Sequence, residues 1–498
     1  MALLNLSGLI TDLNNVISAL DLPNEDLQDL AIYLKSQLNL NQTIDAGIVN
    51  EIRTRVEGVD NTTTLEILAI LSIALSLGTD DRIVTVPDIN ALPDLVTDPL
   101  PSGTILFVES IGTLAMVVKR RWISLDKTLV RDDTVSYTYA WGFNSSGQIG
   151  DGTTTSRSSP VIVVGGITNW KQVSAGSDHS LGVTTTGIAY GWGQSGDGQL
   201  GDDTTSNRSS PVTVVGGITN WSQVSAGGSH SLGVTTTGIA YAWGLGTSGQ
   251  IGDDTTSNRS SPVTVVGGIT NWKQVSAGNL DSLGVTSTGI AYGWGSNGFG
   301  NIGDGTATSR LSPVTVVGGI TNWSQVSAGG DHSLGVTSTG IAYAWGLNTD
   351  GQLGDNTGTT RSSPVTVVGG ITNWRQLDAG SQHRLGVIAT GIAYGWGNNS
   401  TGRLGDNTTT SRSSPVTVVG GITNWSQVSA GGLTSSLNRH SLGLTSSGTA
   451  YAWGSNIVGQ LGDGTTSNRS SPVTVVGSIT NWSQVSAGGD HSLGVYAE

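Results

Sequence analysis

Residues 135–498 contain short stretches in which apolar and polar residues alternate with a period of two, the pattern of β-strands. Around Trp345 the alternating stretches are GIAYAWG, QVSAG and HSLGVT, and PVTVV adds a β-branched run. The turn sequences TSTG, GDNTGTT and GGITN separate them. One such unit therefore predicts four short antiparallel strands.

The unit recurs along the chain with a nearly constant period. A Trp-Gly pair marks each copy, at Trp141, Trp192, Trp243, Trp294, Trp345, Trp396 and Trp453. The spacing is 51 residues five times and then 57. A second tryptophan follows 29 residues after each first one, at Trp170, Trp221, Trp272, Trp323, Trp374, Trp425 and Trp482. Seven short four-strand units predict a closed β-propeller, in which these tryptophans are structural.

The repeat motif also carries a family resemblance. AYAWGxNxxGQLGDG, followed by a proline and then by VSAGGDHSLGVTSTG, resembles the RCC1 repeat over residues 135–498. The resemblance implies a seven-bladed propeller, and it leaves the function open because that fold includes exchange factors, inhibitors and binding modules.

The two ends of the repeat region complement each other. The first copy lacks the HSLGVTSTG strand before it, and the last copy stops at HSLGVYAE without an AYAWG strand after it. We therefore predict that residues 482–496 and 135–165 share one blade, which removes the exposed sheet edges of an open array.

Residues 1–80 show helical periodicity instead. Residues 2–20, 25–38 and 44–56 place apolar residues three and four apart, and LEILAILSIALSLG is nearly all apolar up to Gly78. A helix that is apolar all round is buried in a core or between subunits. Both a small helical bundle and an oligomerisation or docking segment fit this pattern.

Residues 81–134 read as a proline-punctuated linker and a small β module. TILFVES and LAMVVKRRWISLD predict two strands, with Trp122 as the core aromatic residue. In layout and in the GTILFVES…RRWISLD style, residues 1–134 resemble virion structural proteins of tailed bacteriophages. That resemblance implies a virion structural protein, either a fibre or a decoration protein, that is made in the host cytoplasm. It also implies that residues 1–80 dock on other virion proteins and that the protein forms a homo-oligomer such as a trimer.

The charge balance limits the partner classes. The chain has 498 residues and a net charge of −14, without the basic surface that nucleic-acid binding requires. It has no cysteine, so disulfides and thiolate metal sites are excluded. The N-terminus lacks a basic region typical of secretory signals, and the apolar run 65–77 is too short to cross a bilayer. We expect no membrane insertion.

All six histidines occupy one repeat position, which invites a metal or acid-base hypothesis; they are His179, His230, His332, His383, His440 and His491. The third copy has Asp281 there. Seven-fold placement separates these side chains too far for a shared metal ion, and the position matches the RCC1 motif's own histidine. We expect them to be hydrogen-bonding groups between strands.

An aspartate follows each Trp-Gly tryptophan by ten residues, and an arginine follows six residues later, as in Asp355 and Arg361. Asx-turns and a local Asp–Arg contact explain these loops better than a calcium site does. The sequence does not decide whether the loop aspartates bind calcium. The chain shows no Walker loop, GxSxG elbow or paired catalytic carboxylates. We therefore expect no enzyme activity and no cofactor.

Most of the unit is nearly invariant from copy to copy, and the differences gather at two places: after the Trp-Gly pair, and just before the histidine position. In a four-stranded antiparallel blade both places lie on the same side. Diversified loops on a rigid scaffold are typical of binding surfaces. The candidate partner-binding residues are Phe143, Gln194, Leu245, Phe299, Leu347, Ile457, Leu433 and Leu437.

These observations favour a virion protein whose propeller binds a host surface receptor or glycan. The alternative is an RCC1-like binding module that acts as a GTPase exchange factor or a protein inhibitor. Relaxed drift in exposed loops would also diversify them, but drift alone should affect both sides of the ring equally.

Overall fold

The computed structural model describes five strands between residues 84 and 132 and then residues 135–432, 439–477 and 479–497. The chain divides into two compact units, residues 1–135 and 136–498. The helices predicted within residues 1–80 lie outside the described residues, as does the side chain of Trp122. In the described parts no helix has the length and hydropathy needed to cross a membrane.

The first unit contains one five-stranded sheet in the order β1-β2-β3-β4-β5. Its strands are β1 (Val84–Val86), β2 (Ile105–Val108), β3 (Thr113–Val118), β4 (Arg121–Ser124) and β5 (Leu129–Asp132). β1 and β2 are parallel, and the other neighbours are antiparallel. The predicted small β module is present, but the prediction of a single strand over LAMVVKRRWISLD was wrong. That stretch forms the two paired strands β3 and β4, which flank Lys119 and Arg120 in the sequence.

The second unit consists of seven four-stranded antiparallel sheets, each a blade. We number the blades 1 to 7 from β8 onward and name the strands of each blade A to D. The A strands are β8 (Trp170–Ala175), β12 (Trp221–Ala226), β16 (Trp272–Ala277), β20 (Trp323–Ala328), β24 (Trp374–Ala379), β28 (Trp425–Ala430) and β32 (Trp482–Ala487). The B strands are β9 (His179–Thr184), β13 (His230–Thr235), β17 (Asp281–Thr286), β21 (His332–Thr337), β25 (His383–Ile388), β29 (His440–Thr445) and β33 (His491–Ala497).

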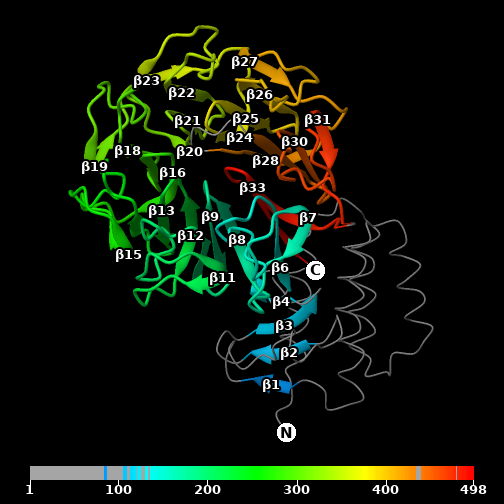
Figure 1. Ribbon diagram of the computed structural model, residues 1–498. Helices are drawn as coiled ribbons and strands as arrows, with labels where there is room; N and C mark the ends of the chain where they lie inside the picture. Colours follow the sequence, from blue (N-terminus) through cyan, green and yellow to red (C-terminus); the bar gives the residue numbers. More distant parts are fainter. Residues whose placement is uncertain are drawn as a thin grey trace, which may run out of the picture. The chain divides into compact units, whose positions relative to one another are not determined.

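The outer half of each blade is made by the C and D strands. The C strands are β10 (Ala189–Gly193), β14 (Ala240–Gly244), β18 (Ala291–Gly295), β22 (Ala342–Gly346), β26 (Ala393–Gly397), β30 (Ala450–Gly454) and β6 (Ser136–Gly142). The D strands are β11 (Arg208–Thr213), β15 (Arg259–Thr264), β19 (Arg310–Thr315), β23 (Arg361–Thr366), β27 (Arg412–Thr417), β31 (Arg469–Thr474) and β7 (Arg157–Ile162). The A strands of successive blades contact one another around the centre, so the blades form a ring (Figure 1).

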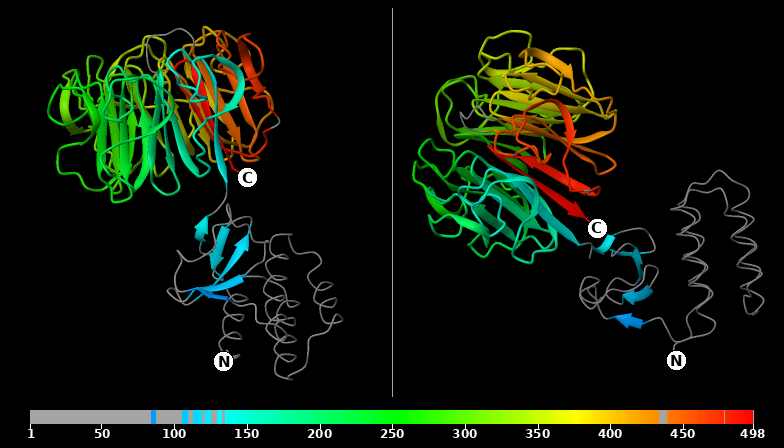
Figure 2. Two further views of the ribbon diagram at one scale, coloured as in Figure 1. Left: turned by 60° about the horizontal axis from the view of Figure 1, so that its bottom comes forward. Right: turned by 45° about the vertical axis from the view of Figure 1, so that its right-hand side comes forward.

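Blade 7 closes the ring with strands from both ends of the repeat region. Its order is β32-β33-β6-β7, so β33 from the C-terminal end lies between β32 and β6. β33 pairs with β6 over seven residues, from His491 opposite Gly142 to Ala497 opposite Ser136. The predicted mixed blade is confirmed, and the two strands lie side by side in both views of Figure 2.

The apolar core lies between the blades. One cluster joins blades 7 and 1 and contains Leu493 and Val495 together with Trp170 and Trp192 of the next blade. The tryptophans of the A and C strands meet at ring-centroid distances of 5.7–5.9 Å in every blade. The B strand carries a glycine beside each A-strand indole, where a side chain would not fit. In blade 1, for example, a Cβ on Gly182 would lie only 2.4 Å from Cζ3 of Trp170. Both faces of a blade are therefore buried, and small residues let neighbouring sheets approach.

A candidate binding surface at one end of the ring

A repeated set of hydrogen bonds joins each blade to the next. In the loop between strands C and D, the carbonyl of Gln199 accepts bonds from Trp243 Nε1 at 2.9 Å and from Ser231 Oγ at 2.8 Å. Both donors belong to the following blade. His179 Nε2 lies 3.0 Å from the same Ser231 Oγ. We call the carbonyl with its tryptophan and serine donors the blade latch.

The latch occurs at six of the seven blade interfaces. The tryptophan donors are Trp141, Trp192, Trp243, Trp294, Trp345 and Trp453, with Nε1–O distances of 2.9–3.0 Å. The carbonyl acceptors are those of Gln460, Gln148, Gln199, Gln250, Asn301 and Arg403. The interface between blades 4 and 5 lacks it: Arg384 stands at the serine position, and Trp396 Nε1 has no hydrogen-bond partner.

The histidines at this position are structural. All six are fully buried, and five lie within 2.7–3.0 Å of a serine hydroxyl of the next blade. Burial lowers the pKa of His230 and of His491 to about 3, so both are neutral at physiological pH. The expected hydrogen-bonding role is confirmed for these five, with the partner in the neighbouring blade. Among the described residues no group of three or more histidine, aspartate or glutamate side chains is placed to hold a metal ion.

The repeated aspartates and arginines also pair as expected. In every blade the aspartate of the C–D loop forms an ion pair with the arginine that begins the D strand, with N–O distances of 2.5–3.5 Å. In blade 7, Asp151 Oδ1 accepts bonds from the N–H and hydroxyl of Thr153, while Oδ2 accepts from Arg157. Burial raises the pKa of Asp151, but the bonds from Thr153 and Arg157 outweigh it and lower the value overall. Both carboxylate oxygens are thus used within the loop.

The two diversified loops of each blade are tied to each other. The residue after the Trp-Gly pair donates its N–H to the carbonyl of the residue before the histidine position, as Gln194 does to Asp178 at 2.9 Å. The same bond occurs in all seven blades at 2.8–2.9 Å. We call the end of the ring formed by these A–B and C–D loops the variable end. The opposite end carries the B–C turns and the connections from strand D to the next blade.

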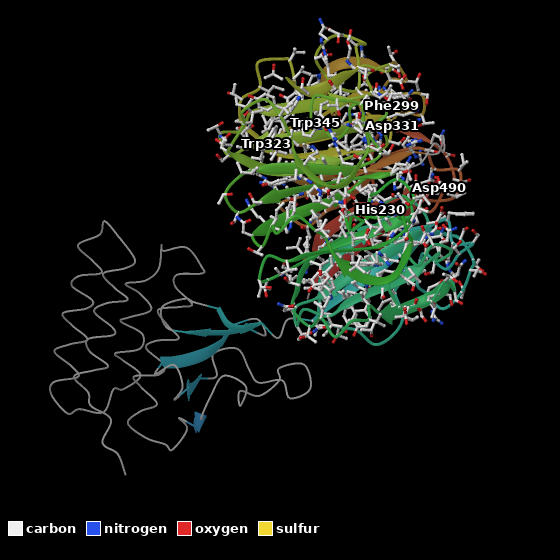
Figure 3. The ribbon with its side chains drawn as sticks, turned by 90° about the vertical axis from the view of Figure 1, so that its left-hand side faces the viewer. His230, Phe299, Trp323, Asp331, Trp345 and Asp490 are labelled. Atoms are coloured by element: carbon white, nitrogen blue, oxygen red, sulfur yellow. The ribbon has the colours of Figure 1, made fainter. Side chains whose placement is uncertain are left out.

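Figure 3 shows Phe299, Asp331 and Asp490 toward the same end of the ring, with Trp323 toward the opposite end. Phe299 in blade 3 is 44% exposed, and Ile457 in blade 6 is 53% exposed. Phe143, Gln194, Leu245 and Leu347 are half-buried where the two loops meet. Leu433 and Leu437 lie outside the described residues.

The variable end also carries charged residues that the sequence reasoning did not select. Asp178, Asp331, Arg439 and Asp490 each occupy the position before the B strand. Burial raises the pKa of Asp490 to about 6, and the negative charge of Asp178 in the adjoining blade adds to this. The varied dipeptides before the histidines carry this signal in the sequence, whereas the predicted binding residues are mainly apolar.

The family comparison agrees with this geometry. Residues 136–437 match the RCC1-like domain, and residues 447–495 match the regulator of chromosome condensation (RCC1) repeat. The chain belongs to the RCC1-like domain family. These matches carry no information on residues 1–134.

Relatives that are named for different activities resemble the propeller. The ultraviolet-B receptor UVR8 of Arabidopsis thaliana is 32% identical over 344 residues, which is 67% of this chain and 76% of that protein. The E3 ubiquitin-protein ligase HERC2 of Mus musculus is 28% identical over 430 residues, 82% of this chain but only 8% of HERC2. A shared RCC1-like fold therefore leaves the activity open.

Two solved RCC1-like structures show the same fold at low sequence identity. Human WBSCR16 superposes with a TM-score of 0.65 at 23% identity, covering 72% of this chain and 98% of that one. Prp20p from Saccharomyces cerevisiae, described with binding properties to Gsp1p and histones, gives 0.65 at 20% identity, covering 73% and 92%. At these identities the likeness concerns the fold alone.

Proposed function

We propose that this RCC1-like propeller is a non-enzymatic display domain that binds a partner through its variable end. The observation that carries the proposal is the concentration of copy-to-copy differences in loops that meet at one end of the ring. Those loops are tied to each other by the same N–H to carbonyl bond in every blade, while their side chains differ. A rigid frame with diverse side chains is how many proteins build a binding surface.

The opposite end supports the proposal by contrast. Its B–C turns repeat one polar arrangement, in which Thr184 Oγ1 accepts the N–H of Ile188 at 3.1 Å and lies 2.9 Å from Thr186 Oγ1. The equivalent bonds recur in blade 2, between Thr235, Thr237 and Ile239. This end is exposed as well, so drift in exposed loops would diversify both ends to a similar degree. The turns of the opposite end change less from copy to copy than the loops of the variable end, although blade 5 has Ile388 and Ala389 in its B–C turn.

The exposed apolar side chains of the variable end are its candidate anchors. Phe299 and Ile457 gain nothing from exposure to water, and large apolar groups surrounded by polar atoms are typical of binding hot spots. They belong to blades 3 and 6, with two blades between them on one side and three on the other. A partner that contacts both must extend across the end of the ring, as a receptor protein or a long glycan does.

For the whole chain we propose a virion structural protein of a tailed phage, fibre or decoration, that displays this propeller to the host. The support is the layout of residues 1–134 and the division into two units. In this proposal residues 1–80 dock on other virion proteins, and the partner of the propeller is a host surface receptor or glycan. The exchange-factor or inhibitor alternative uses the same surface and differs in the partner.

The proposal is tested by removing both anchors, Phe299→Ser and Ile457→Ser, in the full-length protein. Each truncated hot spot costs about 2 kcal/mol or more, and each 1.4 kcal/mol is a tenfold change in affinity. We expect at least a roughly tenfold loss of binding of the fluorescently labelled protein to bacterial host cells. The melting temperature should stay nearly unchanged, because both side chains are exposed.

The matched control is the double variant Val317→Ser and Val476→Ser in the same two blades. These valines lie on the connections from strand D to the next blade, and each is 36% exposed. We expect full binding from this control. Loss of binding in the control with retention in the anchor variant would show that the opposite end is the binding surface.

A further inference from the structure

The interface between blades 4 and 5 departs from the other six. Arg384 replaces the serine that elsewhere donates to the latch carbonyl, and Trp396 Nε1 has no hydrogen-bond partner. At the other six interfaces the equivalent indole N–H donates at 2.9–3.0 Å. A buried donor without an acceptor costs about 1–3 kcal/mol, so this interface has lost a bond that its neighbours keep.

Arg384 itself is buried and unsatisfied. Its relative exposure is 0%, and Nε, Nη1 and Nη2 all lack a hydrogen-bond partner. No ion pair within 4.0 Å joins it to a described carboxylate. Burial lowers the pKa of Arg384 well below its usual range, and the negative charge of Asp350 in the C–D loop of blade 4 opposes this from a distance. A guanidinium withdrawn from water without a partner costs several kcal/mol.

His332 faces the same place from blade 4. Both of its ring nitrogens lack a hydrogen-bond partner, whereas five equivalent histidines reach a serine hydroxyl. Burial lowers the pKa of His332 well below its usual range, and the positive charge of Arg384 adds to this. The neutral ring contributes one further N–H. The guanidinium, the indole and this imidazole thus bring unsatisfied donors to one blade interface.

The group lies directly below the variable end. A Cβ on Gly397 would lie 3.3 Å from Arg384 Nη1, and Gly397 immediately precedes the C–D loop of blade 5. The first residue of that loop, Asn398, donates its N–H to the carbonyl of Gln382 at 2.9 Å. At the interface between blades 5 and 6, burial lowers the pKa of His383, and the positive charges of Arg403, Arg384 and Arg439 lower it further. Positive charge is therefore concentrated around blades 5 and 6.

We propose that the interface between blades 4 and 5 is a binding site for a compact oxyanion of carboxylate or phosphate type, held by Arg384 together with the indole N–H of Trp396. The planar fork of a guanidinium presents two parallel N–H donors, which match the two oxygens of a carboxylate or phosphate group. The anion supplies the charge and the acceptors that the described residues do not. This site goes beyond the proposed partner surface and does not depend on it.

The test follows the tryptophan indole resonances of the uniformly ¹⁵N-labelled full-length protein while acetate or inorganic phosphate is added. Ionic strength is held constant with sodium chloride, so that screening does not change. The resonance of Trp396 is the one that disappears in Trp396→Phe. We expect it to shift with a saturable dependence on at least one of the two anions, while the other indole signals stay in place.

The decisive variant is Arg384→Ser, which restores the residue of the other interfaces and should therefore fold. It should lose the saturable shift, and Arg384→Lys, which keeps the charge without the fork, should bind more weakly. Arg375→Ser removes the same charge from an exposed position of the same blade and should respond like the wild type. A response to acetate alone or to phosphate alone supports the site and identifies the anion. No saturable shift with either anion, or an equal shift in Arg384→Ser, overturns the proposal.

Discussion

Leu493 tests whether the closing blade is as firmly built as the others. It lies on β33, is 0% exposed, and packs in the cluster between blades 7 and 1. Replacing a buried leucine by alanine costs about 2–5 kcal/mol, from lost burial and from the cavity left behind. We expect Leu493→Ala to fall in this range, because β33 is held on both sides by β32 and β6.

The matched control is Leu232→Ala between blades 2 and 3. Leu232 is also 0% exposed, and its cluster repeats that of Leu493, with Ile251, Val265 and Trp272 in place of Ile149, Val163 and Trp170. The two leucines differ in one respect: only the strand of Leu493 joins the two ends of the repeat region.

The assay is thermal unfolding followed by circular dichroism. Residues 136–498 form the unit concerned. With an unfolding entropy of about 2.1 cal/mol/K per residue, its total is roughly 0.8 kcal/mol/K, so a loss of about 3 kcal/mol lowers the melting temperature by about 4 °C. Equal shifts for the two variants are expected. If Leu493→Ala lowers the melting temperature by less than half as much as Leu232→Ala, the closing blade is loose and the reasoning is refuted.

Two further predictions concern pH and assembly. Burial raises the pKa of Asp378 to about 6, although the N–H of Ala430 donates to its carboxylate. The stabilising contribution of the protonated carboxyl group is therefore present at low pH and is lost as pH rises through 6. Asp378→Ser restores the serine of the other copies, so its melting temperature should exceed that of the wild type by more at pH 7.5 than at pH 4.5, and a pH-independent difference would contradict this. The full-length protein should form an oligomer such as a trimer, measured by light scattering, and it should co-sediment with phage particles. A protein that is monomeric at micromolar concentration and stays in the supernatant would refute the role proposed for residues 1–80.

The sequence alone determined the blade count, the strand positions and the mixed closing blade. Alternation with a period of two is a local property of each stretch, and the missing halves of the first and last copies are visible in one dimension. The Asp–Arg pairs were also predictable, because Asp151 and Arg157 are only six residues apart in the sequence. The same local evidence merged β3 and β4, because apolar residues continue on both sides of the basic run Lys119-Arg120-Arg121.

Only the tertiary structure decided what happens between blades. His179 and Ser231 are 52 residues apart, and their contact depends on how two sheets pack. Pattern reasoning put Phe299, Leu347 and Ile457 in one class, yet Leu347 is half-buried while the other two are exposed. Arg384 was readable as a departure from serine, but not as a buried guanidinium without a partner. Exposure and hydrogen bonding at these positions are set by atoms from a neighbouring blade, which no single stretch of sequence contains.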